Sequence, residues 1–259
     1  MKILVCVKQA PPADAPIKID QSQQWVSVYG HALPQMGKYD EYAVEQAIII
    51  KEQVPGTTVD AITNGPAEWA TVLRRALGMG VDHGIQALTL EGGYASALKT
   101  VSCIALAVRA RSYDLILTGV MSEDLAQGLV GPMLAETLSF SCVTSCVSLR
   151  VDESRNCVYA ERDIEGGRRQ LVELALPALV TMQSSTNRPR YPSLSNIMRA
   201  NSQELEVITV ESSEDAVSCE KLLRLSSPQK TRSAVFLQGS SKDKARELLS
   251  ILRKRSVLH

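Results

Sequence analysis

Aromatic side chains are scarce in this sequence, with two Phe, two Trp and seven Tyr among 259 residues. Proteins that bind single-stranded nucleic acid stack bases on exposed aromatic rings, so the scarcity argues against that class. The charge argues the same way, because 28 basic residues are balanced by 28 acidic ones and leave no basic excess for phosphate contacts. We therefore expect no nucleic-acid partner and a core built from aliphatic side chains.

Long apolar runs are also missing. No run approaches the roughly 20 residues that span a bilayer, and the apolar stretch after Lys2 is shorter than the core of a secretory signal. Six cysteines are scattered along the chain, and the pair Cys142 and Cys146 has no second pair and no nearby His. This pattern predicts core thiols in a cytoplasmic protein, without membrane insertion and without a metal site.

Familiar catalytic motifs do not occur either. Neither G-x-G-x-x-G nor G-x4-G-K-[ST] follows a predicted strand, and G-x-S-x-G is absent. The three histidines are too scattered for a readable triad. The acidic residues Asp163 and Glu165 fall in a predicted hairpin, where solvated charge is the expected role. The sequence predicts a binding role and no catalytic residue.

The first 140 residues alternate buried strands with helices. Strands are predicted at 2–7, 59–63, 85–90 and 114–118, and helices at 40–53, 67–77, 95–111 and 125–138. Asp40 is expected to cap the first of these helices, and Asp124 could cap the last. The alternation indicates an α/β fold with a doubly wound, mostly parallel sheet, whose ligands bind beyond the carboxyl ends of the strands.

The pattern changes after residue 140. Strand candidates at 142–149, 157–163 and 168–174 follow one another without a helix, which predicts a β-ribbon added to the edge of the sheet. A strand at 178–182 precedes a polar stretch, then an isolated strand at 205–210, a short strand at 234–237 and a final helix at 242–254. We expect an α/β nucleotide-binding domain at 1–200 and an extended C-terminal arm at 201–259 that packs on a partner subunit.

Two junctions between a strand and a helix could form a mononucleotide site. Asn64-Gly65-Pro66 follows one strand and 118–132 follows another, and the N-terminus of a helix favours an anion. Gly128 and Gly131 would let a phosphate approach the backbone. Asp124 could accept a hydrogen bond from a ribose hydroxyl. The alternatives are an ordinary tight turn at the first junction and a helix cap at the second.

A third feature is the polar segment 187–199, which two prolines stiffen. Such a segment suits presentation to a partner, although a solvated crossover with Tyr191 folded inward is equally compatible. Arg190 and Arg199 could anchor the segment or meet an acidic partner surface.

Together these residues resemble the β (small) subunit of electron-transfer flavoproteins, over essentially the whole chain. The matching segments run in family order: Met1–Gln9, Asp40–Ala47, Asn64–Ala67, Ala76–Gly84, Leu115–Glu136, Glu165–Gly167, Leu176–Ala178 and Pro189–Ala200. The last, P-R-Y-P-S-L-S-N-I-M-R-A, is the most specific. The resemblance implies a Rossmann-like, adenine-nucleotide-binding fold and an electron carrier without catalytic residues. It further implies a heterodimer with an α subunit that holds most of a shared FAD, a structural AMP in this chain, and an acyl-CoA or other dehydrogenase as electron donor.

Family positions carry over to two sets of residues. The nucleotide site would use Cys6, Gly37, Asn64, Gly65, Ser122, Asp124, Gln127, Gly128, Leu129 and Val130. The recognition loop at 183–199 would dock on dehydrogenases through Thr186, Asn187, Arg188, Arg190 and Tyr191. The C-terminal arm would wrap on the α subunit.

The chain departs from the family in several places. Gly37-Lys38 replaces a frequent Asn-Pro, and Leu129 and Val130 replace polar side chains near the phosphate, which leaves backbone amides to bind it. Asp124 is followed by Ala126, so the paired aspartates typical of members that bifurcate electrons with a second FAD are missing, and we favour AMP.

Thr186 stands where members often place an anchoring Leu or Ile, which predicts a different or weaker partner contact. The alternatives are a bifurcating-type β subunit with its own FAD, an empty site, or a nucleotide-binding regulatory module without redox function.

Overall fold

The computed structural model describes residues 1–12, 14–21, 25–28, 33–89, 94–184, 187–209, 220, 222–227, 234 and 236–255. The chain divides into two compact units, Met1–Leu225 and Ser226–His259. The second unit contains the predicted final helix, α6 (Ser241–Lys254), which begins with a capping box between Ser240 and Asp243. No helix among the described residues has both the length and the apolar character needed to cross a membrane.

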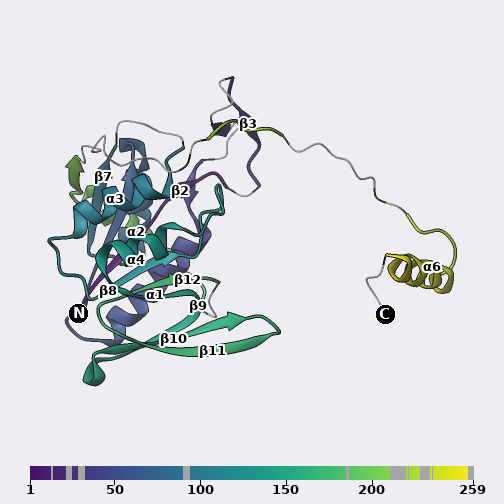
Figure 1. The fold of residues 1–259 in the computed structure, drawn as a ribbon. Coiled ribbons are helices and arrows are strands. Elements are labelled where there is room, and N and C mark those ends of the chain that lie inside the picture. Colours follow the sequence, from purple (N-terminus) through teal and green to yellow (C-terminus); the bar gives the residue numbers. More distant parts are fainter. Residues whose placement is uncertain are drawn as a thin grey trace. The chain divides into compact units, whose positions relative to one another are not determined.

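The first unit is built on a mostly parallel sheet (Figure 1). Among the described residues its strand order is β11-β10-β9-β12-β8-β1-β6-β7-β13. The parallel strands are β1 (Lys2–Cys6), β6 (Thr58–Gly65), β7 (His83–Leu88), β8 (Leu115–Gly119), β12 (Ala178–Met182) and β13 (Glu206–Thr209). The chain moves from β1 to β6 and β7 on one side, and continues with β8 on the other side of β1, so the strand order reverses between β1 and β8.

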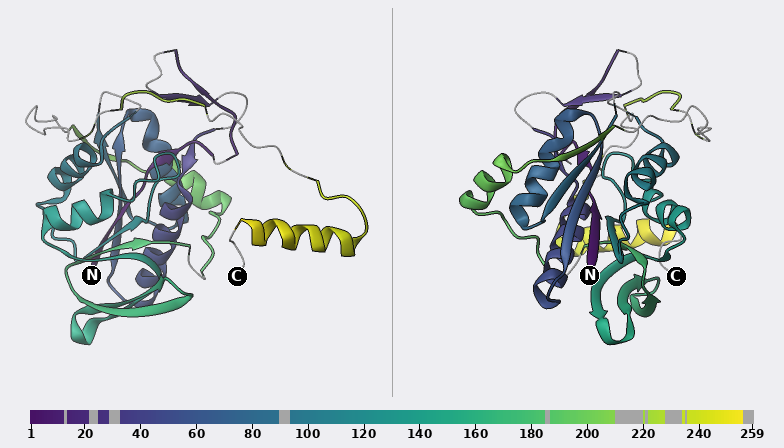
Figure 2. Two further views of the ribbon diagram at one scale, coloured as in Figure 1. Left: turned by 45° about the vertical axis from the view of Figure 1, so that its right-hand side comes forward. Right: turned by 90° about the vertical axis from the view of Figure 1, so that its left-hand side faces the viewer.

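Helices cover both faces of this sheet, as Figure 2 shows. Successive residues of β1 point to opposite faces. Ile3 and Val5 pack in one cluster with α1 (Lys38–Gln53) and α2 (Ala70–Met79), and Leu4 and Cys6 pack in the other with α3 (Ala97–Val108) and α4 (Val130–Leu138). Both clusters are almost entirely aliphatic, as expected from the low aromatic content. The predicted doubly wound α/β fold is confirmed.

The predicted β-ribbon is also confirmed. Strands β9 (Ser141–Asp152), β10 (Cys157–Ile164) and β11 (Arg168–Ala175) are antiparallel, and β9 joins the parallel part through β12. The remaining elements are short: β2 (Gln9–Ala10), β3 (Ile17–Ile19), β4 (Val26–Val28), β5 (Gln35–Met36), the 3-10 helices at Ala67–Trp69 and Glu153–Arg155, and α5 (Leu194–Ser202).

Several local predictions were wrong. The strand near 205–210 is not isolated, because β13 pairs in parallel with β7 and Glu206 forms an ion pair with Arg111. The fourth helix begins at Val130 and not at Leu125, because Ala126 and Gly128 have positive φ angles of 52° and 64° that no α-helix accommodates.

Asp124 therefore lies outside the helix and does not cap it. Asp40 does not cap α1 either. The helix begins at Lys38, with Gly37 at its cap position. The Asp40 carboxylate accepts hydrogen bonds from other segments. Of the short strand predicted at 234–237, residues 234, 236 and 237 are not in a strand, and Val235 lies outside the described residues.

Candidate functional site: a hollow at the strand-order reversal

A hollow lies where the strand order reverses, beyond the carboxyl ends of β1 and β8. It contains about 870 Å³ of empty space, part of it open to solvent, which is within the range of small-molecule sites. The ends of three strands and the N-termini of α3 and α4 line it. We call it the switch-point hollow. Its place is the one predicted from the alternation of strands and helices.

Most of the residues predicted for the nucleotide site are gathered here. Those that line the hollow are Cys6, Asn64, Ser122, Gln127, Gly128, Leu129 and Val130. The other three lie behind it: the Gly37 N–H donates to the Lys8 carbonyl across 3.1 Å, Gly65 packs under the ring of Trp69, and Asp124 is paired with Lys8. That these residues bind a nucleotide stays a prediction.

The side chain of Asp124 is fully engaged. The Lys8 ammonium lies 2.8 and 2.7 Å from its two carboxylate oxygens, and the Asp124 side chain is only 8% exposed. Because Lys8 also lines the hollow, the charge of this lysine is neutralised beside the site. A phosphate entering the hollow would therefore depend mainly on backbone donors.

The N-terminus of α4 offers such donors. Leu129, Val130 and Gly131 line the hollow where the helix begins, and the first N–H groups of a helix have no partner within it. The positive end of the helix dipole lies at the same place. This arrangement can bind an anion without the polar side chains that Leu129 and Val130 replace.

Asp40 forms part of the wall of the hollow, a role that sequence reasoning missed. Its two carboxylate oxygens accept the backbone N–H of Lys8 across 2.8 Å and that of Gly119 across 3.2 Å. It thereby ties together the ends of β1 and β8. Burial raises the pKa of Asp40 to about 7, although the two N–H donors act in the opposite direction. The sequence offered only an acidic residue in the first turn of a predicted helix, and the simplest interpretation of that pattern is a helix cap.

Trp69 is a second residue that sequence reasoning missed. It lines the hollow beside Asn64, and its ring lies against the backbone of Gly65. A Cβ atom at Gly65 would lie only 2.1 Å from Trp69 Cε3, so the glycine is required for this ring position. An aromatic side chain in the first turn after Asn64-Gly65-Pro66 was the signal that could have revealed it.

Cys6 does not have the electrostatics of a nucleophile. It is buried at the end of β1, and burial together with the nearby Asp40 carboxylate raises the pKa of its thiol well above the usual range. The thiol therefore stays protonated and contributes shape and apolar surface to the hollow.

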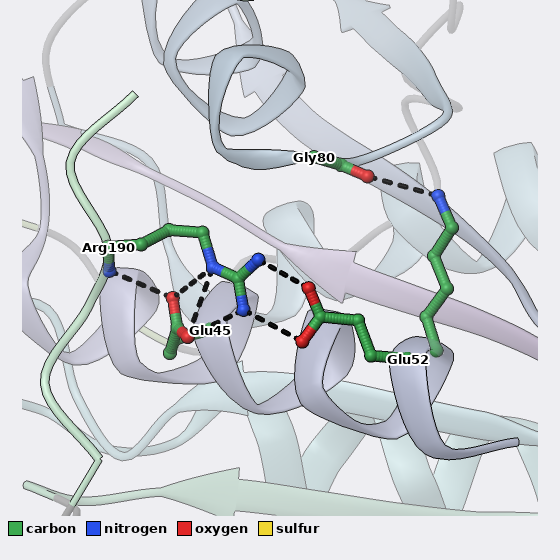
Figure 3. A network of polar contacts seen from close by, with 5 residues as sticks. Glu45, Glu52, Gly80 and Arg190 are labelled. Carbon is green, nitrogen blue, oxygen red and sulfur yellow. Dashed lines mark hydrogen bonds and ion pairs between the residues drawn. The ribbon is translucent and has the colours of Figure 1, made fainter. Parts of the chain in front are cut away.

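Arg190 anchors the predicted recognition loop to the body of the protein (Figure 3). Its guanidinium bonds to Glu45 at 3.0–3.2 Å and to Glu52 at 2.6 Å, and its backbone N–H donates to Glu45 across 2.8 Å. Hydrogen bonds to Glu52 and Glu45 raise the pKa of Arg190 above its already high value. Next to this network Lys51 donates to the Gly80 carbonyl. Of the two roles considered for Arg190, the structure supports anchoring.

Arg199 is anchored in the same way, because it donates to the Leu77 carbonyl across 3.1 Å. Tyr191 is not folded inward: its side chain is 82% exposed, and the Arg75 guanidinium lies 4.6 Å from the centre of its ring. Asn187 and Arg188 are exposed, whereas Thr186 lies outside the described residues.

Two exposed apolar side chains follow Tyr191 in the sequence. Leu194 and Met198 lie four residues apart on α5 and are 75% and 67% exposed. Residues at this spacing share one face of a helix. Sequence reasoning did not single them out, although their spacing in a polar segment was a usable signal. We call Tyr191, Leu194 and Met198 the apolar patch.

Comparison with known proteins identifies the family of this chain. Residues 28–213 match the model of the electron transfer flavoprotein domain. The chain belongs to the electron transfer flavoprotein family. It is 34% identical over 242 residues to the electron transfer flavoprotein subunit beta of Bacillus subtilis, covering 92% of this chain and 89% of the relative. The resemblance to β subunits is thereby confirmed.

Other electron transfer flavoprotein relatives come from different settings. The mitochondrial subunit beta of Arabidopsis thaliana is 30% identical over 244 residues, covering 92% of this chain and 94% of the relative. A subunit of the caffeyl-CoA reductase-Etf complex of Acetobacterium woodii, named CarD, is 31% identical over 209 residues, covering 80% of this chain and 78% of the relative. The similarity thus extends both to simple β subunits and to a subunit of a reductase complex.

Proposed function

We propose that this chain is the β subunit of an electron-carrying heterodimer whose larger α subunit holds most of a shared FAD. The observation that carries the proposal is the switch-point hollow in a chain of the electron transfer flavoprotein family. The chain contributes no catalytic side chain to this role. It completes the flavin site, excludes water from it and positions the flavin near the cofactor of a partner.

We further propose that the hollow holds one AMP. The phosphate would lie at the N-terminus of α4, where backbone N–H groups and the helix dipole favour an anion. The adenine would stack on Trp69, the one aromatic ring among the lining residues of this described hollow. The site is adequate for adenosine monophosphate: it has aromatic and apolar walls, few charges and an anion-binding helix end.

The apolar patch is the proposed docking surface for an acyl-CoA or other dehydrogenase. Exposed apolar side chains that adjoin one another mark protein–protein interaction sites. The patch is held in place by Arg190 and Arg199, whose bonds to the body of the protein fix the two ends of the segment. Leu194 and Met198 would supply the apolar anchor.

The remaining assignments follow from this role. We propose that, of the arm expected at 201–259, the unit Ser226–His259 packs on the α subunit, whereas β13 belongs to the central sheet; the leucines Leu248 and Leu249 of α6 are exposed for such a contact. The buried thiols of Cys6, Cys103 and Cys157 support a reducing, cytoplasmic location.

Co-expression with the flavin-binding subunit of the same organism tests the proposal. We expect the chain purified alone to be colourless and the purified complex to be yellow, with one FAD per heterodimer. A lone chain with stoichiometric FAD would point to the type that carries its own flavin. A stable homodimer that exchanges ATP would point to the regulatory module.

A further inference from the structure

The side-chain amide of Asn64 is an unsatisfied polar group in the wall of the switch-point hollow. Its Oδ1 is buried and has no hydrogen-bond partner among the described residues. Side-chain oxygens of Thr57, Asp60 and Thr63 share this property, but of these four residues Asn64 is the one that lines the hollow. Because an unpaired buried polar group is unfavourable, a ligand that completes the bonds of this amide gains affinity from them.

Strand pairing places the amide on the face of the sheet that α3 and α4 cover. Asn64 lies in register with Ala87 of β7, and Ala87 packs in the same cluster as α3 and α4. Ile62, two residues before Asn64, belongs to that cluster too, together with its register partner Cys6. Side chains alternate along a strand, so Ile62 and Asn64 point to the same face. Asn64 therefore extends beyond Cys6 toward the hollow.

A neighbouring amide already meets the structural needs of the turn after β6. Gln86 Nε2 donates to the carbonyls of Gly65, across 3.3 Å, and Pro66, across 2.7 Å. These two bonds fix the turn that follows Asn64, and Asn64 Oδ1 takes no part in them. A structural role in the turn thus belongs to Gln86 and leaves the Asn64 amide for another use.

The distance from the proposed phosphate position fits the base of a mononucleotide. The phosphate is proposed at the start of α4, which follows β8, whereas Asn64 lies on β6. These two strands flank β1, so their ends lie about 10 Å apart, two strand spacings. A mononucleotide that begins at α4 would reach the end of β6 with its base, where Trp69 also lines the hollow. Asn64 would then meet the edge of that base.

We propose that Asn64 is a specificity-determining residue, whose amide reads the edge of the base and selects adenine. Its Oδ1 accepts the 6-amino group and its Nδ2 donates to N7, a donor and an acceptor that adenine presents side by side. Guanine and hypoxanthine present two acceptors at this edge and cannot form both bonds. The last torsion of an Asn side chain is broad and two-fold, so the buried oxygen can turn toward the base.

This inference rests on the proposed function, in which the hollow binds a nucleotide, and deepens it by naming the group that recognises the base. Calorimetric titration of the complex with its flavin subunit, after removal of bound nucleotide, tests it with AMP and inosine monophosphate (IMP). IMP carries a 6-oxo group in place of the 6-amino group. The wild-type complex is expected to bind AMP at least about tenfold more tightly than IMP, since a paired amide discriminates between bases to this extent.

Asn64→Leu keeps the size of the side chain and removes both bonds. We expect it to weaken AMP at least about tenfold and to bring the two nucleotides to within about threefold of each other. The urea midpoint of the nucleotide-free complex should stay the same or rise, because the variant loses an unpaired polar group.

Gln46→Leu is the matched control. Gln46 is a buried amide on α1 that does not line the hollow, and its Nε2 donates to the Leu149 carbonyl across 3.1 Å. Its replacement should lower the urea midpoint, because that carbonyl loses its partner, and should keep the wild-type preference for AMP.

Three results would count against these proposals. Equal binding of AMP and IMP by the wild-type complex, or an unchanged AMP-to-IMP ratio in Asn64→Leu, would overturn the inference and leave nucleotide binding by the hollow intact. A lower urea midpoint for nucleotide-free Asn64→Leu would show that the amide is bonded within the protein, and would overturn the inference as well. A wild-type complex that binds neither nucleotide would contradict the proposed function itself.

Discussion

The carboxylate of Asp40 accepts the backbone N–H of Gly119 across 3.2 Å, and this contact leaves no room for a side chain at position 119. A Cβ atom there would lie 2.4 Å from Asp40 Oδ1 and 2.9 Å from the Cβ of Tyr39. Since Asp40 also binds the Lys8 N–H, the end of β8, the end of β1 and the start of α1 are held at fixed positions around the hollow.

Gly119→Ala should therefore disturb the site as well as the fold. We expect a loss of about 1–3 kcal/mol in the free energy of unfolding, which is the usual cost of overpacking. Nucleotide affinity should fall with it, because the wall of the hollow must move. Urea unfolding and calorimetry measure the two effects. A variant with wild-type stability would show that the approach of Asp40 to Gly119 is not tight.

The raised pKa of Asp40 predicts a pH dependence of stability. The folded carboxyl has a pKa of about 7, whereas an unfolded Asp has about 3.9. Between these values the folded state binds more protons than the unfolded state, so the Asp40 contribution to stability falls as pH rises from about 4 through 7.

Asp40→Asn should lower stability, because an amide cannot accept both N–H bonds, and should also flatten this slope. Urea unfolding from pH 5 to 8 measures it. Asp114→Asn is the matched control: Asp114 accepts the Lys2 N–H at the opposite end of β1, so its loss removes a similar bond. If Asp40→Asn kept the wild-type slope, the burial of this carboxyl would not be the cause of the pH dependence of stability.

Arg190→Ala should destabilise the protein by about 2 kcal/mol, measured by urea unfolding. The change leaves Glu45, whose side chain is 7% exposed, without its cation. The expected cost is below the 3–5 kcal/mol typical of fully buried pairs, because the Arg190 side chain is 34% exposed. Arg188→Ala, an exposed arginine two residues earlier, should have almost no effect. Equal effects of the two substitutions would contradict the anchoring role.

Trp69→Ala should weaken AMP binding by about 1–3 kcal/mol, the usual contribution of stacking an aromatic ring on a base. Trp69→Phe should retain most of the affinity. AMP should also quench tryptophan fluorescence in a Trp25→Phe variant, which keeps Trp69 as its only tryptophan. Quenching by AMP in the single variant Trp69→Phe, whose only tryptophan is Trp25, would place the base elsewhere.

The apolar patch predicts a separation between docking and nucleotide binding. Leu194→Asp and Met198→Asp should each slow electron transfer from a dehydrogenase at least about tenfold, since a charge in an apolar anchor costs well over 1 kcal/mol. AMP affinity should stay unchanged. Leu171→Asp provides the control, because Leu171 is similarly exposed, on β11 in the ribbon. An equal slowing by Leu171→Asp would contradict a specific patch.

The parallel sheet and the position of the hollow could be predicted from the sequence. Strands such as β1 are continuous apolar runs, and the helices between them have a clear amphipathic period, so the topology rules leave few arrangements. The hollow then follows from the reversal of strand order. Glycines and polar residues after β6 and β8 marked its walls for the same reason.

The contacts within the site could not be predicted, because they join residues distant in sequence. The position of Asp40 in the first turn of a helix predicted a helix cap. In the folded chain its carboxylate instead accepts the backbone N–H groups of Lys8 and Gly119. Asp124 could be assigned several roles from the sequence, but its ion pair with Lys8 joins residues too far apart in the chain to be foreseen. The helix expected from Leu125 begins later because backbone conformation at Ala126 overrides a sequence that is otherwise compatible with a helix.

Native mass spectrometry of the complex between this chain and its flavin-binding partner is the most direct test of the central claim. The released small molecules report in one measurement what the hollow holds. We predict one FAD and one AMP for each heterodimer, with less AMP retained by Trp69→Ala. Two FAD molecules per heterodimer, or a hollow without any adenine nucleotide, would contradict the account.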